Sequence, residues 1–80
     1  MNLPTPEQVQ NYISQGIDCA HIVVEGDGQH FYATIVSKQF ENQRTLARQR
    51  AVYAVLGTRM VAEIHALSMK TYTPDEWAKL

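Results

Sequence analysis

The sequence is poor in cysteine, and this limits the sites that its own side chains can build. Cys19 is the single cysteine among 80 residues, so no disulfide can form within the chain. The C-x-x-C and H-x₃-H spacings that are typical of zinc sites are also missing. A lone thiol suits a reducing compartment, and we expect a cytoplasmic protein.

Long apolar runs and a secretory signal pattern are missing as well. The first four residues include neither a basic stretch nor an apolar one, which argues against a signal peptide. No apolar run approaches the roughly 20 residues that a membrane-spanning helix needs. With 45% hydrophobic and 19% charged residues, the composition is typical of a globular protein, and we expect one domain over residues 1–80.

The charges are distributed unevenly along the chain. The net charge of −1 provides no overall attraction to nucleic acid or to anionic lipid. All four arginines nevertheless lie in one stretch that contains no acidic residue: Arg44, Arg48, Arg50 and Arg59. This stretch is either a solvated helix face or a face that binds a partner.

Local patterns predict the elements of the N-terminal half. Thr5 as N-cap, Pro6 at the first helical position and Gln8 closing a capping box predict a helix over about residues 6–15. Gly16 is expected to end this helix in the left-handed conformation. Alternating apolar and polar residues then predict strands over residues 19–25 and 30–37, joined as a hairpin by the turn between them.

The C-terminal half predicts two helices, a third strand and a last helical turn. The helices are expected over residues 45–56 and from about position 60, and the strand over residues 66–72. A second capping box, of Thr73 and Glu76, predicts the helical turn from Pro74. A crossover of two helices is long enough to return the third strand parallel to the second. We therefore expect an α+β fold of α-β-β-α-α-β-α order, similar to a type II KH module, with a three-stranded mixed sheet and helices on one face.

The apolar faces of these elements predict the hydrophobic core. The expected members are Val9, Ile13, Ile22, Val24, Phe31, Ala33, Ile35, Val52, Leu56, Val61 and Leu67. Phe40 is expected to anchor the polar connection that leaves the second strand. No nucleophile elbow and no phosphate-loop lysine accompany this pattern, so we expect a binding protein and not an enzyme.

Two histidines precede or begin neighbouring strands of the expected sheet. His30 begins the second strand and His65 directly precedes the third, so parallel strands would bring both imidazoles to one end. Cys19 and His21 begin the antiparallel first strand and are expected at the opposite end. Two imidazoles are too few for a stable zinc or iron–sulfur site, so a site shared with another protein would fit.

Nucleic acid is an alternative partner. The helices around Gly57 and Thr58 loosely resemble a helix-turn-helix, and Arg44, Arg48 and Arg50 are the expected phosphate contacts. The RNA clamp of a type II KH module is missing, because its G-x-x-G loop would need a second glycine after Gly57.

Several segments together resemble the BolA family over nearly the whole chain. They are the hairpin Gly26-Asp27-Gly28-Gln29-His30-Phe31, the residues Val36, Ser37 and Phe40, the helical segment Arg48-Gln49-Arg50-Ala51-Val52-Tyr53, and the segment from Ile64-His65-Ala66-Leu67 to Thr73-Pro74-Asp75-Glu76-Trp77. The short hairpin is similar to the acid-stress branch of the family, the IbaG type. One departure is Gln49, where many members carry a histidine between the two arginines.

The resemblance implies a KH-like α+β fold that pairs with a monothiol glutaredoxin around a shared 2Fe–2S cluster, in iron–sulfur and iron homeostasis. His65 matches a family ligand of that cluster, and His30 is the candidate for the second ligand from the hairpin. Glutathione and the glutaredoxin would complete the site, and the isolated chain is expected to hold no cluster. The resemblance also implies, as the alternative, a stress-response transcriptional regulator that binds DNA.

Overall fold

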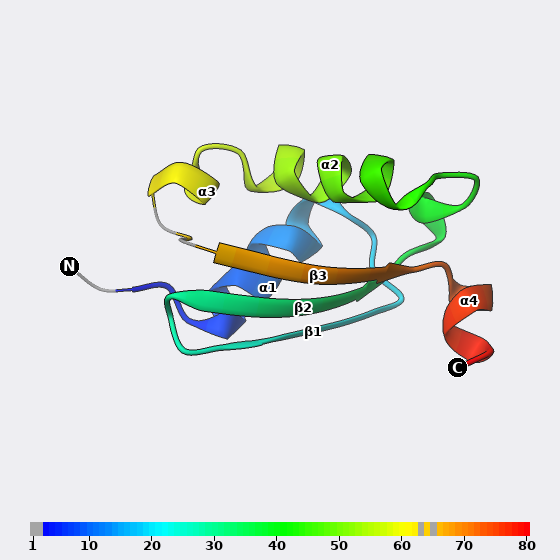
Figure 1. Cartoon of the computed structure of the whole chain (residues 1–80), viewed down its shortest axis with the longest axis horizontal. Helices are drawn as coiled ribbons and strands as arrows, with labels where there is room; N and C mark the ends of the chain where they lie inside the picture. The colour runs from blue at the N-terminus through cyan, green and yellow to red at the C-terminus, as the bar shows by residue number, and fades with distance from the viewer. Residues whose placement is uncertain (1–2, 63, 65) are drawn as a thin grey trace.

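The computed structural model describes residues 3–62, 64 and 66–80, without the side chains of Val61 and Ala62. The elements follow one another as α1 (Pro6–Gly16), β1 (His21–Gly26), β2 (His30–Val36), the 3₁₀ turn η1 (Lys38–Phe40), α2 (Thr45–Leu56), α3 (Arg59–Ala62), β3 (Ala66–Tyr72) and α4 (Pro74–Ala78) (Figure 1). The predicted order of helices and strands is confirmed. None of the helices in this part of the chain is long and apolar enough to cross a membrane.

The sheet has the predicted mixed topology, with β2 between β1 and β3. β1 runs antiparallel to β2, with Val24 opposite Ala33, and β3 runs parallel to β2, with His30 opposite Ala66. In Figure 1 the chain leaves β2 at one end, passes along α2 and α3, and re-enters the sheet at the other end. This long return is what makes the parallel pairing possible.

One face of the sheet is buried under α1 and α2. The core joins buried side chains of β1 and β2 to those of both helices, and eight predicted members are confirmed: Val9, Ile13, Val24, Phe31, Ala33, Ile35, Val52 and Leu56. Ile22 and Leu67 are partly buried and pack against this core. The side chain of Val61 lies outside the described residues.

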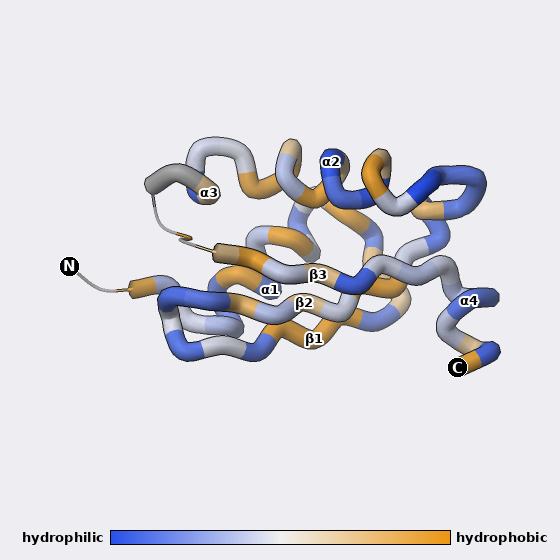
Figure 2. Tube along the Cα trace, in the orientation of Figure 1, coloured by the Kyte–Doolittle hydropathy of each residue, from blue (hydrophilic) through white to orange (hydrophobic). Residues whose placement is uncertain are grey.

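Four further buried residues come from the connections and from the end of β2: Ile17, Val36, Phe40 and Ile64. Figure 2 shows the hydropathy pattern behind this arrangement, with hydrophilic residues gathered in the β1–β2 turn and in the loop that enters α2. In η1, for example, Phe40 is buried in the core, whereas Lys38 and Gln39 are exposed to solvent.

Capping boxes begin the first and last helices as predicted. The Thr5 hydroxyl accepts from the backbone N–H of Gln8 at 3.1 Å, and the side-chain oxygen Oε1 of Gln8 accepts from Thr5 N–H at 2.9 Å. Thr73 and Glu76 repeat the arrangement at α4. Each cap accepts from backbone N–H groups that have no acceptor within the helix, and typically stabilises the fold by about 1 kcal/mol.

The prediction that Gly16 ends α1 in the left-handed conformation is wrong. Gly16 is the last helical residue, and Ile17 caps the helix with an extended backbone at φ −127° while its N–H donates to the Ile13 carbonyl. A Cβ at Gly16 would lie 2.5 Å from Cγ1 of Val55 on α2. The glycine is therefore required by the close approach of α1 and α2, a tertiary contact that local sequence does not reveal.

Candidate functional site

The beginnings of β2 and β3 meet at one end of the sheet. The parallel register places His30, the first residue of β2, opposite Ala66, the first residue of β3. His65 directly precedes Ala66 in the sequence but lies outside the described residues. His21 pairs with Val36 at the other end of the sheet, so the structure separates it from His30 as expected.

The turn before β2 fixes the backbone of His30. One carboxylate oxygen of Asp27 accepts from the N–H groups of Gln29 and His30 at 2.9 and 3.0 Å. These hydrogen bonds, that of His30 first, lower the pKa of the Asp27 carboxyl below its ordinary value. Gly26 has a φ of 156°, and a Cβ there would lie 2.4 Å from the His30 carbonyl oxygen, so the turn requires glycine.

The imidazole of His30 lies on the outer face of the sheet, opposite to the helices. Its Nε2 is 3.0 Å from the Ser68 hydroxyl on β3, and its ring stacks on Tyr32 with 4.4 Å between centroids and 19° between planes. Among the described residues no hydrogen bond to Nδ1 is found. Tyr32 is 57% exposed, so this cluster faces solvent.

The donor chemistry of His30 fits one ligand position of an iron–sulfur cluster. Imidazole nitrogen replaces thiolate on one iron in some 2Fe–2S centres. His30 presents a half-buried ring whose Nδ1 has no hydrogen-bond partner among the residues that the structure describes. Within residues 3–62, 64 and 66–80, no three or more His, Cys, Asp or Glu residues are grouped so that they could hold a metal ion. In that part of the chain His30 is therefore at most one candidate ligand, and another protein would have to complete such a site.

Cys19 has a different environment. Burial, followed by the nearby Asp18 carboxylate, raises the pKa of its thiol. Its Sγ donates to the Ile17 carbonyl at 3.4 Å, and its side chain packs against the core. Because the thiolate is the form that binds metal, these surroundings disfavour Cys19 as a ligand.

The structure corrects the expectation that Arg48 contacts phosphate. The residue is 8% exposed, and its guanidinium donates to both carboxylate oxygens of Glu76 at 2.7 and 3.1 Å. It also donates to the carbonyl oxygens of Gln43 and Thr71, at 2.9 and 3.2 Å. Arg48 thus ties α2 to the end of β3 and to α4, whereas Arg44 and Arg50 are exposed.

Acid should weaken the link between Arg48 and Glu76. The Arg48 hydrogen bonds, followed by that from Thr73 N–H, lower the pKa of Glu76 from its ordinary 4.5 to about 2. A depressed folded-state pKa means that the stabilisation is complete above about pH 4.5 and is lost as the pH falls towards 2. Urea unfolding at a series of pH values should show the stability of the wild type and of Glu76→Gln converging over this range.

Asp75→Asn is the matched control for this experiment, since it removes a carboxylate from the same helical turn without touching Arg48. The difference in the free energy of unfolding between the wild type and this control should change less with pH than the difference between the wild type and Glu76→Gln. If the latter difference stays constant from pH 5 to pH 2, this would contradict the assigned role of the ion pair.

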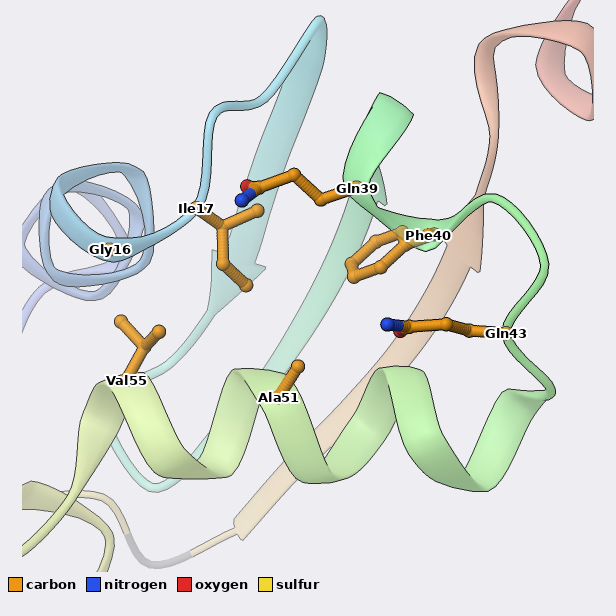
Figure 3. Close-up of a pocket in the computed structure, with 7 residues that line it drawn as sticks. All are labelled: Gly16, Ile17, Gln39, Phe40, Gln43, Ala51 and Val55. Carbon is orange, nitrogen blue, oxygen red and sulfur yellow. The ribbon is translucent and has the colours of Figure 1, made fainter.

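A pocket of about 220 Å³ lies between α1, η1 and α2 (Figure 3). Its lining combines apolar side chains with two primary amides, and consists of Gly16, Ile17, Gln39, Phe40, Gln43, Ala51 and Val55. The side-chain oxygen Oε1 of Gln39 already accepts from Asp18 N–H at 2.8 Å. The pocket belongs to the helical layer, on the other side of the sheet from His30.

Comparison with known proteins agrees with this fold. The model of the family described as BolA-like protein matches residues 11–76. Acid stress protein IbaG of Escherichia coli K12 is 34% identical over 74 residues, which cover 90% of this chain and 87% of that protein. The DNA-binding transcriptional regulator BolA of Vibrio cholerae is 40% identical over 60 residues, covering 75% of this chain and 57% of that protein.

The fold is likewise shared with a solved structure. A bolA protein homologue from Coxiella burnetii superimposes with a TM-score of 0.82 at 44% identity, covering 94% of this chain and 97% of that one. The family match spans most of the chain, from within α1 to α4, and includes the hairpin that carries His30. On this combined evidence of sequence and structure, the chain belongs to the BolA family.

Proposed function

We propose that this chain is an accessory protein that pairs with a monothiol glutaredoxin around a shared 2Fe–2S cluster, in iron–sulfur and iron homeostasis. BolA proteins are not enzymes, so a role in binding fits the family. The observation that carries the proposal is the register of β2 and β3. His30 lies opposite Ala66. The family resemblance implies a ligand role for His65, the residue before Ala66, and makes His30 the candidate for the second ligand.

The chain's own contribution would be nitrogen ligands at one iron. His65 and His30 would supply imidazoles, and thiolates of the glutaredoxin cysteine and of glutathione would hold the other iron. When bound, the cluster supplies one-electron redox chemistry, and neutral imidazole in place of charged thiolate would raise its reduction potential. The turn at Asp27 would hold His30 in place before the partner arrives.

Anaerobic reconstitution tests the proposal. The chain, a monothiol glutaredoxin, and the two together would each be supplied with glutathione, iron and sulfide, then examined by native mass spectrometry and visible circular dichroism. We expect a heterodimer with one 2Fe–2S cluster, whose spectrum differs from that of the glutaredoxin alone. A glutaredoxin spectrum that the chain leaves unchanged, with no heterodimer, would overturn the proposal.

DNA binding is a second candidate, favoured by two exposed arginines at α2. Arg44 is the N-cap of this helix and Arg50 lies in its middle, and residues 42–62 contain no acidic side chain. The V. cholerae relative is named as a DNA-binding regulator. With Arg48 engaged by Glu76, the phosphate contacts would come from Arg44 and Arg50.

The salt dependence of duplex binding tests this alternative. If both arginines contact phosphate, a log–log plot of affinity against salt should have a slope of roughly −1.8, and Arg44→Ala or Arg50→Ala should each reduce its magnitude by about 0.9. Lys38→Ala removes a cation from η1 and should change nothing. Fluorescence anisotropy that detects no duplex binding below about 100 μM at physiological salt would exclude the regulator function.

A further inference from the structure

His30 is held at its backbone by the preceding turn, and its ring contacts two side chains of the outer face. Asp27 bonds its backbone N–H, Tyr32 stacks on its ring, and the Ser68 hydroxyl lies 3.0 Å from Nε2. The register of β2 and β3 pairs Tyr32 with Ser68, so the two neighbours of the ring are adjacent to each other on one face. These contacts leave Nδ1 as the ring nitrogen without a hydrogen bond among the described residues.

We propose that Ser68 is a positioning residue for His30, and that by holding Nε2 its hydroxyl leaves Nδ1 as the nitrogen that binds iron. The inference rests on the proposed function, because it requires His30 to be a cluster ligand. It goes further by naming the ligating atom and the residue that selects it.

The selection follows from the chemistry of a neutral imidazole. Such a ring has one N–H and one lone pair, and a metal takes the lone pair, so the other nitrogen must keep the proton. With iron on Nδ1, the proton stays on Nε2, and Nε2–H donates to the Ser68 oxygen at the distance observed. Histidines that bind metals usually donate their second ring N–H in this way, which fixes both the tautomer and the ring orientation.

The reverse orientation is disfavoured by the same neighbours. Rotation of the ring by half a turn would replace Nε2 by carbon at the Ser68 hydroxyl, and this hydrogen bond would be lost. Stacking against Tyr32, at 19° between ring planes, restricts intermediate tilts of the ring. The Asp27 oxygen that lies nearby already accepts from two backbone N–H groups.

The first test uses the isolated chain without metal. Long-range ¹H–¹⁵N NMR, at a pH where the imidazole is neutral, observes both ring nitrogens of each histidine. We expect the Nε2 resonance of His30 to shift in Ser68→Ala, which removes the hydrogen-bond partner, and to return towards its wild-type position in Ser68→Thr, which keeps the hydroxyl. Thr34→Ala removes a hydroxyl from the same face without contacting His30, and should leave this resonance unchanged.

The second test identifies the ligating atom in the reconstituted complex. Histidine labelled with ¹⁵N at either Nδ1 or Nε2 would be incorporated, and pulsed EPR of the reduced cluster compared with that of His30→Ala to isolate the His30 signal. We expect strong hyperfine coupling from Nδ1 of His30, which weakens in Ser68→Ala and returns in Ser68→Thr. Strong coupling from Nε2 instead would overturn the assignment.

The two tests separate the inference from the function on which it rests. An Nε2 resonance of His30 that is the same in Ser68→Ala as in the wild type overturns the role of Ser68, even if the cluster forms normally. Failure of the wild-type chain to form any cluster with the glutaredoxin overturns the proposed function and the iron assignment, whatever the NMR experiment shows about Ser68.

Discussion

The His65→Ala variant is expected to lose the visible spectrum of the cluster formed with a monothiol glutaredoxin, even where the two proteins still associate. The family resemblance makes His65 a ligand, and a 2Fe–2S cluster needs all four of its ligands. Alanine supplies no donor, so the iron on the side of this chain would be left incompletely bound. Visible circular dichroism of the reconstituted complex measures the loss, and native mass spectrometry reports association separately.

Two matched variants test at which end of the sheet the cluster binds. His30→Ala should weaken the spectrum, because His30 lies at the end where β3 begins. Cys19→Ser should leave it unchanged, because Cys19 precedes β1 at the opposite end and donates its thiol to the Ile17 carbonyl. A spectrum that survives His65→Ala but disappears with Cys19→Ser would reject the ligand assignment.

Ile35→Ala is expected to lower the free energy of unfolding by about 2–5 kcal/mol. Ile35 is 0% exposed and lies in the core between the sheet and the two covering helices. Truncation removes buried methyl and methylene groups and leaves a cavity that close-packed neighbours fill only in part. The total free energy of unfolding of a chain of 80 residues is expected to be modest, so this loss is a large share of it.

Val23→Ala is the matched control for the core variant. Val23 lies on the outer face of β1 and is 38% exposed, so its truncation should cost about 1 kcal/mol or less. Urea titration followed by circular dichroism measures both variants under the same conditions. A loss below about 1 kcal/mol for Ile35→Ala, or equal losses for the two variants, would contradict the assignment of the inner face.

Both departures from the sequence predictions involve contacts between distant elements. Gly16 looked like a helix terminator, but its lack of a side chain accommodates Val55 on α2. Arg48 looked like part of a solvated cationic face, but its guanidinium reaches the β3–α4 junction and bonds Glu76. The capping box that places Glu76 was readable from the sequence, whereas its second role as an acceptor for Arg48 was not.

The sequence by itself determined the order of elements, the parallel return of β3 and the end of the sheet where His30 lies. These features follow from local rules: caps satisfy open N–H groups, side chains alternate across a strand, and a crossover of two helices allows a parallel pairing. Only the tertiary structure decided which groups touch His30, because Ser68 is 38 positions away in the sequence. The spacing of residues along a chain predicts which face a side chain occupies, but its hydrogen-bond partner depends on the register between strands and on how closely the helices pack over them.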